Sequence, residues 1–350
     1  MDFWRDRPVF VTGHTGFKGS WLSLWLQKRH ARVTGFALPP PTKPSMFAAT
    51  EIGGHMHHVE GDIRDGERLH EALAQAAPEI VFHLAAQSLV REGYRDPVGT
   101  IATNVLGTVN LLEAVRRQPT VKAAVVVTSD KCYQNREWLW PYREDEALGG
   151  KEPYSASKAC AEILSAAWRD AFLTERVTLA TVRAGNVIGG GDWAPDRLVP
   201  DALRAWQDKQ ILKVRSPNAI RPWQHVLEPL AGYLSLAERL YVGEAVGAWN
   251  FGPDENDCLT VAGLLERLAA RWGDGAGWQA DSGMHPAETG MLRIDSSRAR
   301  HRLGWRPRLD SNDALTRTVA WHRAWLAGQD MRQFSLNQID DYERPAPGNP

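Results

Sequence analysis

The chain starts its regular structure with Pro8-Val9-Phe10-Val11-Thr12-Gly13-His14-Thr15-Gly16-Phe17-Lys18-Gly19, a short apolar strand that runs into three spaced glycines. A helix is predicted to follow from Ser20 to about Arg29. Glycines between a strand and a helix let the backbone approach a diphosphate, whose charge the helix N-terminus favours. The GxxGxxG spacing is wider than GxGxxG, and an ordinary strand-to-helix turn is the alternative. Its place at the head of an α/β chain favours cofactor binding.

Strands and helices alternate from this loop to about residue 188, which predicts a Rossmann-type, doubly wound parallel sheet. The predicted strands after the first are Arg32–Leu38, Val59–Ile63, Glu79–Ala85, Val121–Thr128 and Val177–Ile188. The predicted helices between them are Glu67–Ala76, Pro97–Arg117 and Glu152–Thr174. We therefore place the chain in the α/β class.

The regular alternation stops after Gly189-Gly190-Gly191-Asp192-Trp193. Beyond it, the sequence predicts helices at Pro200–Lys209, Glu228–Leu240, Val261–Trp272 and Asp313–Trp325, and short strands at Ile211–Val214, Trp249–Phe251 and Gln279–Asp281. We predict a cofactor-binding Rossmann domain over residues 1–188 and a smaller mixed substrate-binding domain mainly over 189–330, whose segments can return to the sheet. Residues 331–350 are predicted to be a loosely held tail.

Composition excludes several classes of protein. The net charge is −1 and charges of both signs are mixed along the 350 residues, so neither nucleic acid nor a membrane is an expected partner. No apolar run approaches the roughly 18 residues that span a bilayer. Three cysteines without CxxC spacing predict a cytoplasmic, reducing setting. His55, His57 and His58 are interpreted as an exposed loop rather than a metal site, because no carboxylate is suitably spaced.

A second informative stretch follows the fifth predicted strand and reads Thr128-Ser129-Asp130-Lys131-Cys132-Tyr133. It places a hydroxyl, a carboxylate and an amine in consecutive positions at the carboxyl end of a strand, where open parallel sheets bind ligands. Tyr154 and Lys158 are four residues apart and so share one face of a predicted helix. We interpret the two stretches as one active site, in which Cys132 packs rather than reacts.

The Tyr154 phenol is a candidate base for an alcohol. A free tyrosine has a pKa of about 10, but a nearby Lys158 and a positive nicotinamide ring favour the phenolate. Tyr154 then takes a proton from a sugar hydroxyl while hydride leaves for the cofactor, and Ser129 hydrogen-bonds the same oxygen. Each motif also has a non-catalytic interpretation. Tyr154 and Lys158 can be a chance YxxxK on an ordinary helix, and Asp130 and Lys131 can form an exposed ion pair in a loop. The glycine loop and the strand-end position favour catalysis.

From about Pro8 to Trp325, the chain resembles the extended short-chain dehydrogenase/reductase family, which includes the NAD-dependent epimerases and dehydratases. The matching residues are Gly13, Gly16, Gly19, Asp62, Ile63, Leu84, Ala85, Ala86, Asn104, Ser129, Tyr154, Lys158 and Arg183-Ala184-Gly185-Asn186. Within the family, it is most similar to the 4,6-dehydratases that act on CDP-D-glucose. That similarity is carried by Val11–Leu22, Thr128–Tyr133, Leu148–Gly150, Pro153–Ser155 and Arg183–Trp193. Other sugar-nucleotide dehydratases generally have Asp-Glu where this chain has Asp130-Lys131.

The resemblance implies a lyase, a hydro-lyase with an internal redox cycle. Tyr154 and NAD oxidise the C4 hydroxyl of CDP-D-glucose, and the resulting ketone acidifies C5 so that water is eliminated across C5–C6. A protonated Asp130 donates to the departing C6 hydroxyl, and a neutral Lys131 removes the C5 proton. Hydride then returns to C6, which gives CDP-4-dehydro-6-deoxy-D-glucose and regenerated NAD.

The predicted site residues fall into three groups. The catalytic candidates are Ser129, Asp130, Lys131, Tyr154 and Lys158. The cofactor candidates are Gly13, Gly16, Phe17, Lys18, Gly19, Asp62, Ile63, Leu84, Ala85, Ala86, Thr128, Tyr154 and Lys158. The substrate candidates are Gln87, Asn186, Arg197, Arg221 and Arg293, with Arg221 at the position where related enzymes carry an arginine against the diphosphate. A surface salt bridge is the alternative for Arg197 and Arg293, and a structural bond to backbone for Gln87 and Asn186.

Cofactor type, partner and rival functions stay open at this point. The second strand ends in Ala37-Leu38-Pro39, which carries neither the acid typical of NAD nor the arginine typical of NADP. The resemblance favours NAD, while Arg32 and Lys43 keep NADP possible.

A nucleotide-sugar 4-epimerase and a non-enzymatic NAD-sensing protein are the rival functions. The family also implies a homodimer or higher oligomer through the helices Pro97–Arg117 and Pro153–Thr174, and selectivity for the CDP base rests on resemblance alone.

Overall fold

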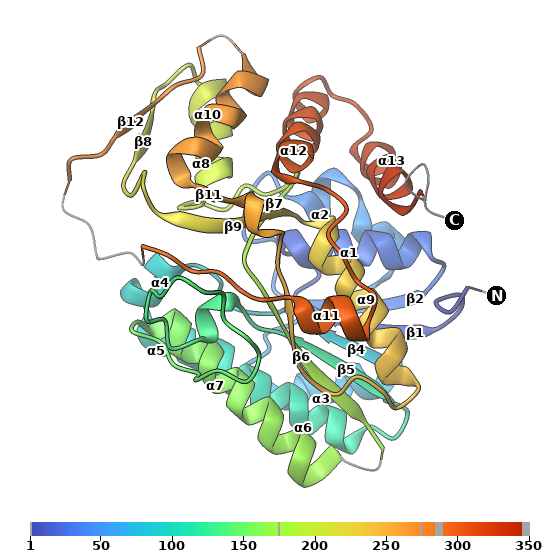
Figure 1. Cartoon of the computed structure of the whole chain (residues 1–350). Coiled ribbons are helices and arrows are strands. Elements are labelled where there is room, and N and C mark those ends of the chain that lie inside the picture. The colour runs from blue at the N-terminus through green and yellow to red at the C-terminus, as the bar shows by residue number, and fades with distance from the viewer. Residues whose placement is uncertain (1, 174–175, 274, 284–289, 345–350) are drawn as a thin grey trace.

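A seven-stranded, all-parallel sheet forms the centre of the computed structural model, which describes residues 2–173, 176–273, 275–283 and 290–344 (Figure 1). The strand order is β10-β6-β5-β4-β1-β2-β3. In chain order these strands are β1 (Pro8–Thr12), β2 (Arg32–Ala37), β3 (His57–Glu60), β4 (Ile80–His83), β5 (Ala123–Val127), β6 (Thr178–Ala184) and β10 (Gly247–Phe251). Because β1 pairs with both β2 and β4, the order reverses there, and a crevice is expected at the carboxyl ends of β1 and β4. The predicted Rossmann-type sheet is confirmed.

Helices cover both faces of this sheet because successive strand residues point to opposite sides. Val9 and Val11 pack into one core and Phe10 into the other. The first core lies under α1 (Phe17–Lys28) and α9 (Leu227–Tyr241). On the opposite face lie α3 (Gly66–Ala76), α5 (Pro97–Ile101), a π-helical turn (Ala102–Leu106), α6 (Gly107–Arg117) and α7 (Pro153–Trp168), shown low in Figure 1.

A smaller lobe sits above the carboxyl edge of the sheet (Figure 1). Its strands are β7 (Asn186–Ile188), β9 (Ile220–His225) and β11 (Cys258–Thr260) in one sheet, and β8 (Leu212–Val214) and β12 (Trp278–Ala280) in another. Its main helices are α8 (Leu198–Gln207), α10 (Val261–Trp272) and α12 (Ser311–Leu326), and the short helices of the chain are α2 (Met46–Ala49), α4 (Val90–Arg95) and α11 (Ser297–Arg302).

The chain crosses between the two lobes at Gly185. A side chain there would bring its Cβ within 2.5 Å of the Pro222 ring, so the close approach of β9 requires glycine. The prediction of one strand over 177–188 is therefore wrong, because the strand divides into β6 and β7 in different sheets. The chain later returns to the large sheet, where β10 pairs with β6.

The predicted loose tail is wrong for residues 331–343, which form helix α13 (Met331–Glu343). Glu343 accepts hydrogen bonds from Trp25 Nε1 at 2.6 Å and Lys28 Nζ at 2.6 Å, both on α1. Tyr342 is buried, and its hydroxyl donates to the buried Glu228 at 2.9 Å. Apolar and charged contacts together therefore hold this helix against the cofactor-binding half, and residues 345–350 lie outside the described residues.

One helix in the described part of the chain is long and apolar enough, by length and composition alone, to cross a membrane. It spans Pro97–Arg117, with a mean hydropathy of 1.3 in its most apolar window. The helix is not a continuous apolar run, because Asn104, Thr108 and Asn110 interrupt it. Leu111, Leu112 and Val115 on one of its faces are fully buried in the core beside α3.

Removing the ring of Tyr342 tests whether α13 is part of the folded core. Tyr342→Ala removes a buried ring that packs edge-on against Trp25 at 5.6 Å, and is expected to lower the free energy of unfolding by about 3–5 kcal/mol. Tyr342→Phe keeps the ring but leaves Glu228 without that donor, and is expected to cost about 1–3 kcal/mol. Denaturant titration measures both, and an unchanged Tyr342→Ala protein would contradict the packing of α13.

Candidate active site

The glycine loop between β1 and α1 lies directly against the end of β4. Gly13 has φ +75°, and a Cβ there would lie 2.5 Å from the backbone nitrogen of Ala85. A Cβ on Gly19 would lie 2.1 Å from the carbonyl oxygen of Gly13. Gly16 is the N-cap of α1, and no side chain caps the first turn of that helix. The structure thus brings together the predicted residues Gly13, Gly16, Gly19, Leu84 and Ala85, and their bare backbone fits a dinucleotide diphosphate.

Lys18 of this loop faces the catalytic groups as well as the cofactor cradle. Burial, and then the charges of Arg197 and Lys158, lower the pKa of the Lys18 ammonium to about 8, while Asp130 acts in the opposite direction. The neighbouring Phe17 ring lies close under Gly189 of the smaller lobe. The loop therefore links the predicted cofactor and substrate regions.

The turn after β5 carries the predicted acid. Ser129 is the N-cap of a short 3-10 turn, Asp130–Cys132, and its Oγ accepts from the backbone N–H of Lys131 at 3.2 Å. The Ser129 hydroxyl donates to Asp130 Oδ1 at 3.0 Å. Asp130 is 3% exposed, and its Oδ2 has no hydrogen-bond partner among the described residues.

Burial makes Asp130 a candidate proton donor. Desolvation raises the pKa of its carboxyl, and the charges of Lys131 and Arg221 act in the opposite direction. A raised pKa favours the protonated acid, which is the form that can protonate a departing hydroxyl. The arginine predicted for the diphosphate is thus within electrostatic reach of the predicted acid.

Helix α7 presents Tyr154 and Lys158 to the same strand end. Pro153 opens the helix, and the Glu152 carboxylate caps it by accepting from the N–H groups of Tyr154 and Ser155 at 2.7 and 2.9 Å. Burial raises the pKa of Tyr154 to about 12, and a hydrogen bond with Ser129 opposes that rise. Burial lowers the pKa of Lys158 to about 8.

The Lys158 ammonium is anchored to β5 rather than left in solvent. Its Nζ donates to the carbonyl oxygen of Val127 at 3.2 Å. Ser129, Asp130, Tyr154 and Lys158 are all buried, and they come from the end of β5 and the first turns of α7. The arrangement can exchange a proton with a substrate alcohol at Tyr154 and deliver a second proton from Asp130.

The predicted substrate residues differ in their surroundings. Arg197 donates to Asp192 at 2.9 Å and to the Ser88 hydroxyl at 2.9 Å, so it bridges the smaller lobe and the loop after β4. Its charge also lowers the pKa of Tyr154, against the larger effect of burial. Arg293 pairs with the exposed Glu255 at 3.0 Å, the surface salt bridge that was its alternative.

Two amide side chains complete the predicted substrate set. The Gln87 amide donates to the Thr100 hydroxyl at 2.9 Å, and its backbone N–H donates to Asn104 at 2.8 Å. Asn186 begins β7 and is partly buried opposite Trp223. Gln87 thus has a structural role in shaping the loop after β4, whatever it binds.

Three predicted cofactor residues have partners within the chain. Asp62 pairs with Arg64 at 2.5 Å, and Ile63 packs against Gly107 of α6. The Thr128 hydroxyl bonds to the Glu162 carboxylate and to the carbonyl oxygen of Val182. Their roles toward a cofactor, like those of Ala86 and the catalytic set, stay predictions.

Sequence reasoning missed the buried carboxylate of Glu162. It lies 3% exposed behind the predicted catalytic lysine and pairs with Arg183 Nη2 at 2.8 Å. The available signal was its position on α7, one helical turn after Lys158. An acidic residue at that spacing usually indicates a solvent-exposed ion pair, so its burial was not evident from the sequence.

Metal chemistry has no candidate site in the part of the chain that the structure describes. No group of three or more His, Cys, Asp or Glu side chains lies close enough together to hold an ion.

The predicted exposed histidine loop is partly wrong, because His57 and His58 begin β3 and His58 Nδ1 lies 2.7 Å from His14 Nε2. Cys132 is buried in a small apolar cluster, as predicted.

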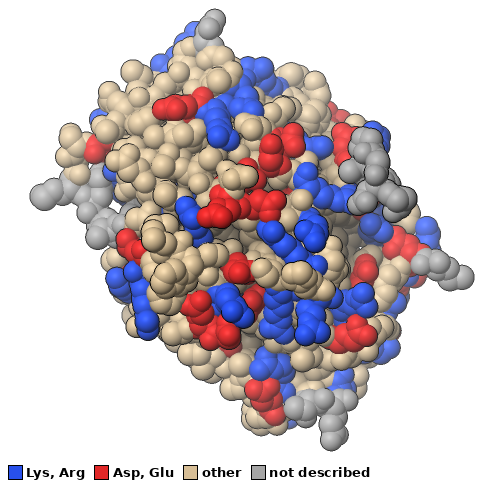
Figure 2. Space-filling view, in the orientation of Figure 1, with Lys and Arg blue, Asp and Glu red and all other residues tan. Residues whose placement is uncertain are grey.

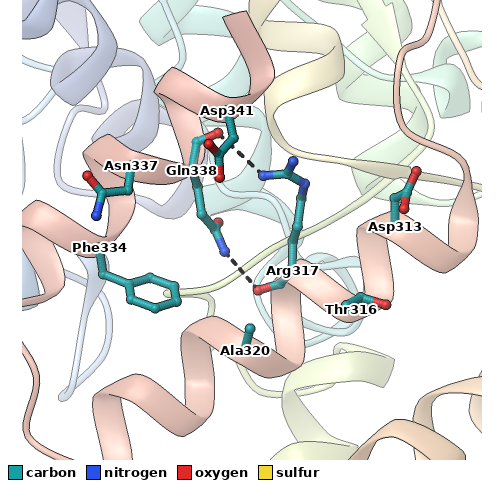
Figure 3. A pocket seen from close by; sticks show the side chains of 8 residues that line it. All are labelled: Asp313, Thr316, Arg317, Ala320, Phe334, Asn337, Gln338 and Asp341. Atoms are coloured by element: carbon teal, nitrogen blue, oxygen red, sulfur yellow. Dashed lines mark hydrogen bonds between the residues drawn. The ribbon is translucent and has the colours of Figure 1, made fainter. Parts of the chain in front are cut away.

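One groove of about 400 Å³ is lined by none of the predicted site residues. Figure 3 shows the side chains around it. It runs between α12 and α13, where the Gln338 amide donates to the Arg317 carbonyl oxygen at 3.0 Å. Figure 2 shows acidic and basic side chains interspersed over one face of the molecule.

Comparison with known proteins decides the family. Residues 9–252 match the NAD dependent epimerase/dehydratase family. The chain belongs to that family. It is 51% identical, over 97% of both chains, to the CDP-glucose 4,6-dehydratase of Salmonella typhimurium. It is 30% identical to the dTDP-glucose 4,6-dehydratase of Streptomyces griseus, over 91% of this chain and 95% of the relative. The resemblance inferred from the sequence motifs is thus confirmed, and with it an NAD-dependent enzyme.

Solved structures of this family share the fold. A UDP-glucose-4-epimerase from Stenotrophomonas maltophila with bound NAD superposes with a TM-score of 0.80 at 22% identity, over 92% of this chain and 99% of that one. A dTDP-glucose 4,6-dehydratase from Bacillus anthracis in complex with NAD gives a TM-score of 0.77 at 22% identity, over 91% and 96%. Epimerases and dehydratases therefore share this architecture, and the fold alone does not separate them.

The glycine loop supplies a matched pair of variants. Gly19→Ala places a Cβ 2.1 Å from the Gly13 carbonyl oxygen and is expected to lower thermal stability and abolish NAD binding. Gly16→Ala meets that oxygen only at 3.4 Å, an ordinary contact, and is expected to keep the wild-type melting temperature. Calorimetric NAD titration and thermal melts measure both effects. Equal stability of the two variants would contradict the close packing described here.

Proposed function

We propose that this protein is a hydro-lyase that converts CDP-D-glucose to CDP-4-dehydro-6-deoxy-D-glucose and water. The observation that carries the proposal is the buried acid Asp130, which stands between Ser129 and Lys131 at the end of β5, beside Tyr154 and Lys158. The 51% identity with a CDP-glucose 4,6-dehydratase over nearly the whole chain supports the same substrate.

The first step is removal of a proton from the sugar C4 hydroxyl by Tyr154. Burial is the largest effect that keeps this phenol neutral, and the charges of Asp130 and Glu152 act in the same direction. The positive charge of Lys158, one helical turn away, favours the base form, together with the hydrogen bond from Ser129 and the charge of Arg197. Ser129 hydrogen-bonds the same oxygen and orients it. NAD, when bound, accepts the C4 hydride and later returns it to C6.

The second step is loss of water across C5 and C6. The C4 ketone acidifies the C5 proton, and neutral Lys131 removes it. Asp130, kept protonated by burial, donates its proton to the C6 hydroxyl as that group departs. Lys131 and Asp130 are adjacent in one turn, and we assign Lys131 to the ring carbon C5 and Asp130 to the hydroxyl of the exocyclic carbon C6.

The diphosphate of the substrate needs cations near the catalytic residues. Arg197 and Arg221 suit it, because both act electrostatically on catalytic residues and a planar guanidinium matches phosphate oxygens. Because Arg197 and Arg221 belong to the smaller lobe, we propose that this lobe binds the nucleotide sugar. The large sheet and its helices bind the cofactor, and β10 and α13 belong to that half.

A nucleotide-sugar 4-epimerase is the main rival function. An epimerase uses the Ser, Tyr and Lys groups but has no need for an acid with a raised pKa after Ser129. A non-enzymatic NAD sensor has no need for a buried Tyr154 and Lys158. Incubation with CDP-glucose, without added NADH, separates the three functions. A 4-keto-6-deoxy product is expected, and a galacto-configured product or no product would contradict the proposal.

Lys131→Met tests whether Lys131 acts in elimination and not in C4 oxidation. The variant is expected to keep C4 oxidation, because Tyr154 and Ser129 are intact, but to stall elimination by at least about a hundredfold, the usual contribution of a positioned base. Uptake of solvent deuterium at C5, followed by NMR, is the measurement. Tyr154→Phe is the control that loses both steps, and normal turnover of Lys131→Met would refute the role of Lys131.

We also propose a homodimer in the cytoplasm. The helices Pro97–Arg117 and α7 expose apolar side chains, among them Val98, Leu106 and Ile163 at 78%, 56% and 56%. These two helices pack side by side, so the exposed groups form one apolar face suited to a second copy. Ile163→Glu is expected to shift the protein toward monomers in sedimentation experiments. Leu139→Glu changes an apolar side chain that is 76% exposed on a loop outside both helices, and is expected to leave the association unchanged.

A further inference from the structure

A buried ion pair joins helix α7, which carries Tyr154 and Lys158, to strand β6. Glu162 and Arg183 are each 3% exposed, and Arg183 Nη2 donates to Glu162 Oε2 at 2.8 Å. The Thr181 hydroxyl donates to Oε2 at 2.6 Å, and the Thr128 hydroxyl bonds to Oε1. Both carboxylate oxygens are therefore fixed by hydrogen bonds, and Glu162 is almost fully shielded from solvent.

Glu162 and Lys158 reach the same strand end. They are four residues apart on α7, so their side chains leave the helix on one face. Lys158 Nζ donates to the carbonyl oxygen of Val127, and Glu162 bonds to the hydroxyl of the next residue, Thr128. The two side chains thus attach the last residue of β5 and the residue that follows it to consecutive turns of α7.

The other charged and titratable groups around Lys158 do not stabilise its protonated form as the Glu162 carboxylate does. Lys18 from the glycine loop repels it, and His83 on β4 is neutral because burial lowers its pKa to about 3. The Cys132 thiol stays protonated because burial raises its pKa. Glu162 is the carboxylate that opposes the effect of burial on Lys158.

We propose that Glu162 is a positioning residue for proton abstraction at C4: its carboxylate, anchored by Arg183, keeps Lys158 charged and held against the end of β5. The inference rests on the proposed function, in which the phenolate of Tyr154 depends on that charge. Glu162 acts through Lys158 and touches neither substrate nor cofactor.

Arg183 fixes Glu162 to the rest of the site. Its Nη1 donates to the Tyr133 hydroxyl at 2.8 Å and to the carbonyl oxygen of Glu144 at 3.1 Å. The Tyr133 hydroxyl in turn donates to Asn250 on β10 at 2.8 Å. One network of hydrogen bonds therefore joins the catalytic helix, the turn that carries the acid, and the edge strand β10.

The direct test is the titration of Lys158 in the free protein, followed by NMR of ¹³C-labelled lysine and assigned with Lys158→Arg. The paired variant Glu162→Gln/Arg183→Met removes both charges, so it leaves no unpaired charge buried. Its Lys158 signal is expected to titrate about one pH unit below that of the wild type, a tenfold change in the ratio of ammonium to amine. Thr181→Val keeps both charges and is the control expected to titrate as the wild type.

The single variant Arg183→Met is expected to shift the titration of Lys158 in the opposite direction. It also provides a test if the paired variant does not fold. It leaves the Glu162 carboxylate without its neutralising partner, so Lys158 is expected to titrate at higher pH than in the wild type. An unchanged titration in either variant would overturn the inference, and so would a fall in Arg183→Met.

The pH dependence of turnover separates this inference from the proposed function. With CDP-glucose as substrate, the alkaline limb of kcat is expected to move down with the Lys158 titration in the paired variant. A purely structural role would lower kcat equally at every pH and leave the limb in place. If the wild type does not turn over CDP-glucose, the proposed function fails, while the NMR titration still decides whether Glu162 sets the charge of Lys158.

Discussion

Desolvation at the carboxyl end of β5 is the constraint on which the rest of the site depends. Ionisable groups that are taken out of water lose the solvation of their charged forms. Asp130 consequently gains a proton-donor form, and Lys18 and Lys158 move toward their neutral forms. The fold achieves this by covering the strand end with the glycine loop on one side, α7 on another and the smaller lobe above.

Much of this arrangement could be predicted from the sequence, because it is encoded locally. The glycine loop, the strand alternation and the Tyr154–Lys158 spacing each depend on near neighbours in the chain. The parallel sheet then adds the non-local information, since strand ends of a doubly wound fold meet at one edge. This is why the predicted catalytic residues Ser129, Asp130, Tyr154 and Lys158 lie together in the structure.

The failures of prediction share a different cause. The break at Gly185 depends on how closely Pro222 approaches it, and the order of α13 depends on a distant partner, Glu228. The burial of Glu162 depends on Arg183 in a strand that pairs far along the chain. In each case the deciding contact joins residues that are far apart in the chain, and a local sequence pattern does not reveal it.

Helix α13 has a consequence for how the protein is made. Trp25 and Lys28 on α1 donate to Glu343 of α13, and Trp25 packs edge-on against Tyr342. These contacts join segments about 300 residues apart, so α1 can reach its native surroundings only after α13 has been translated.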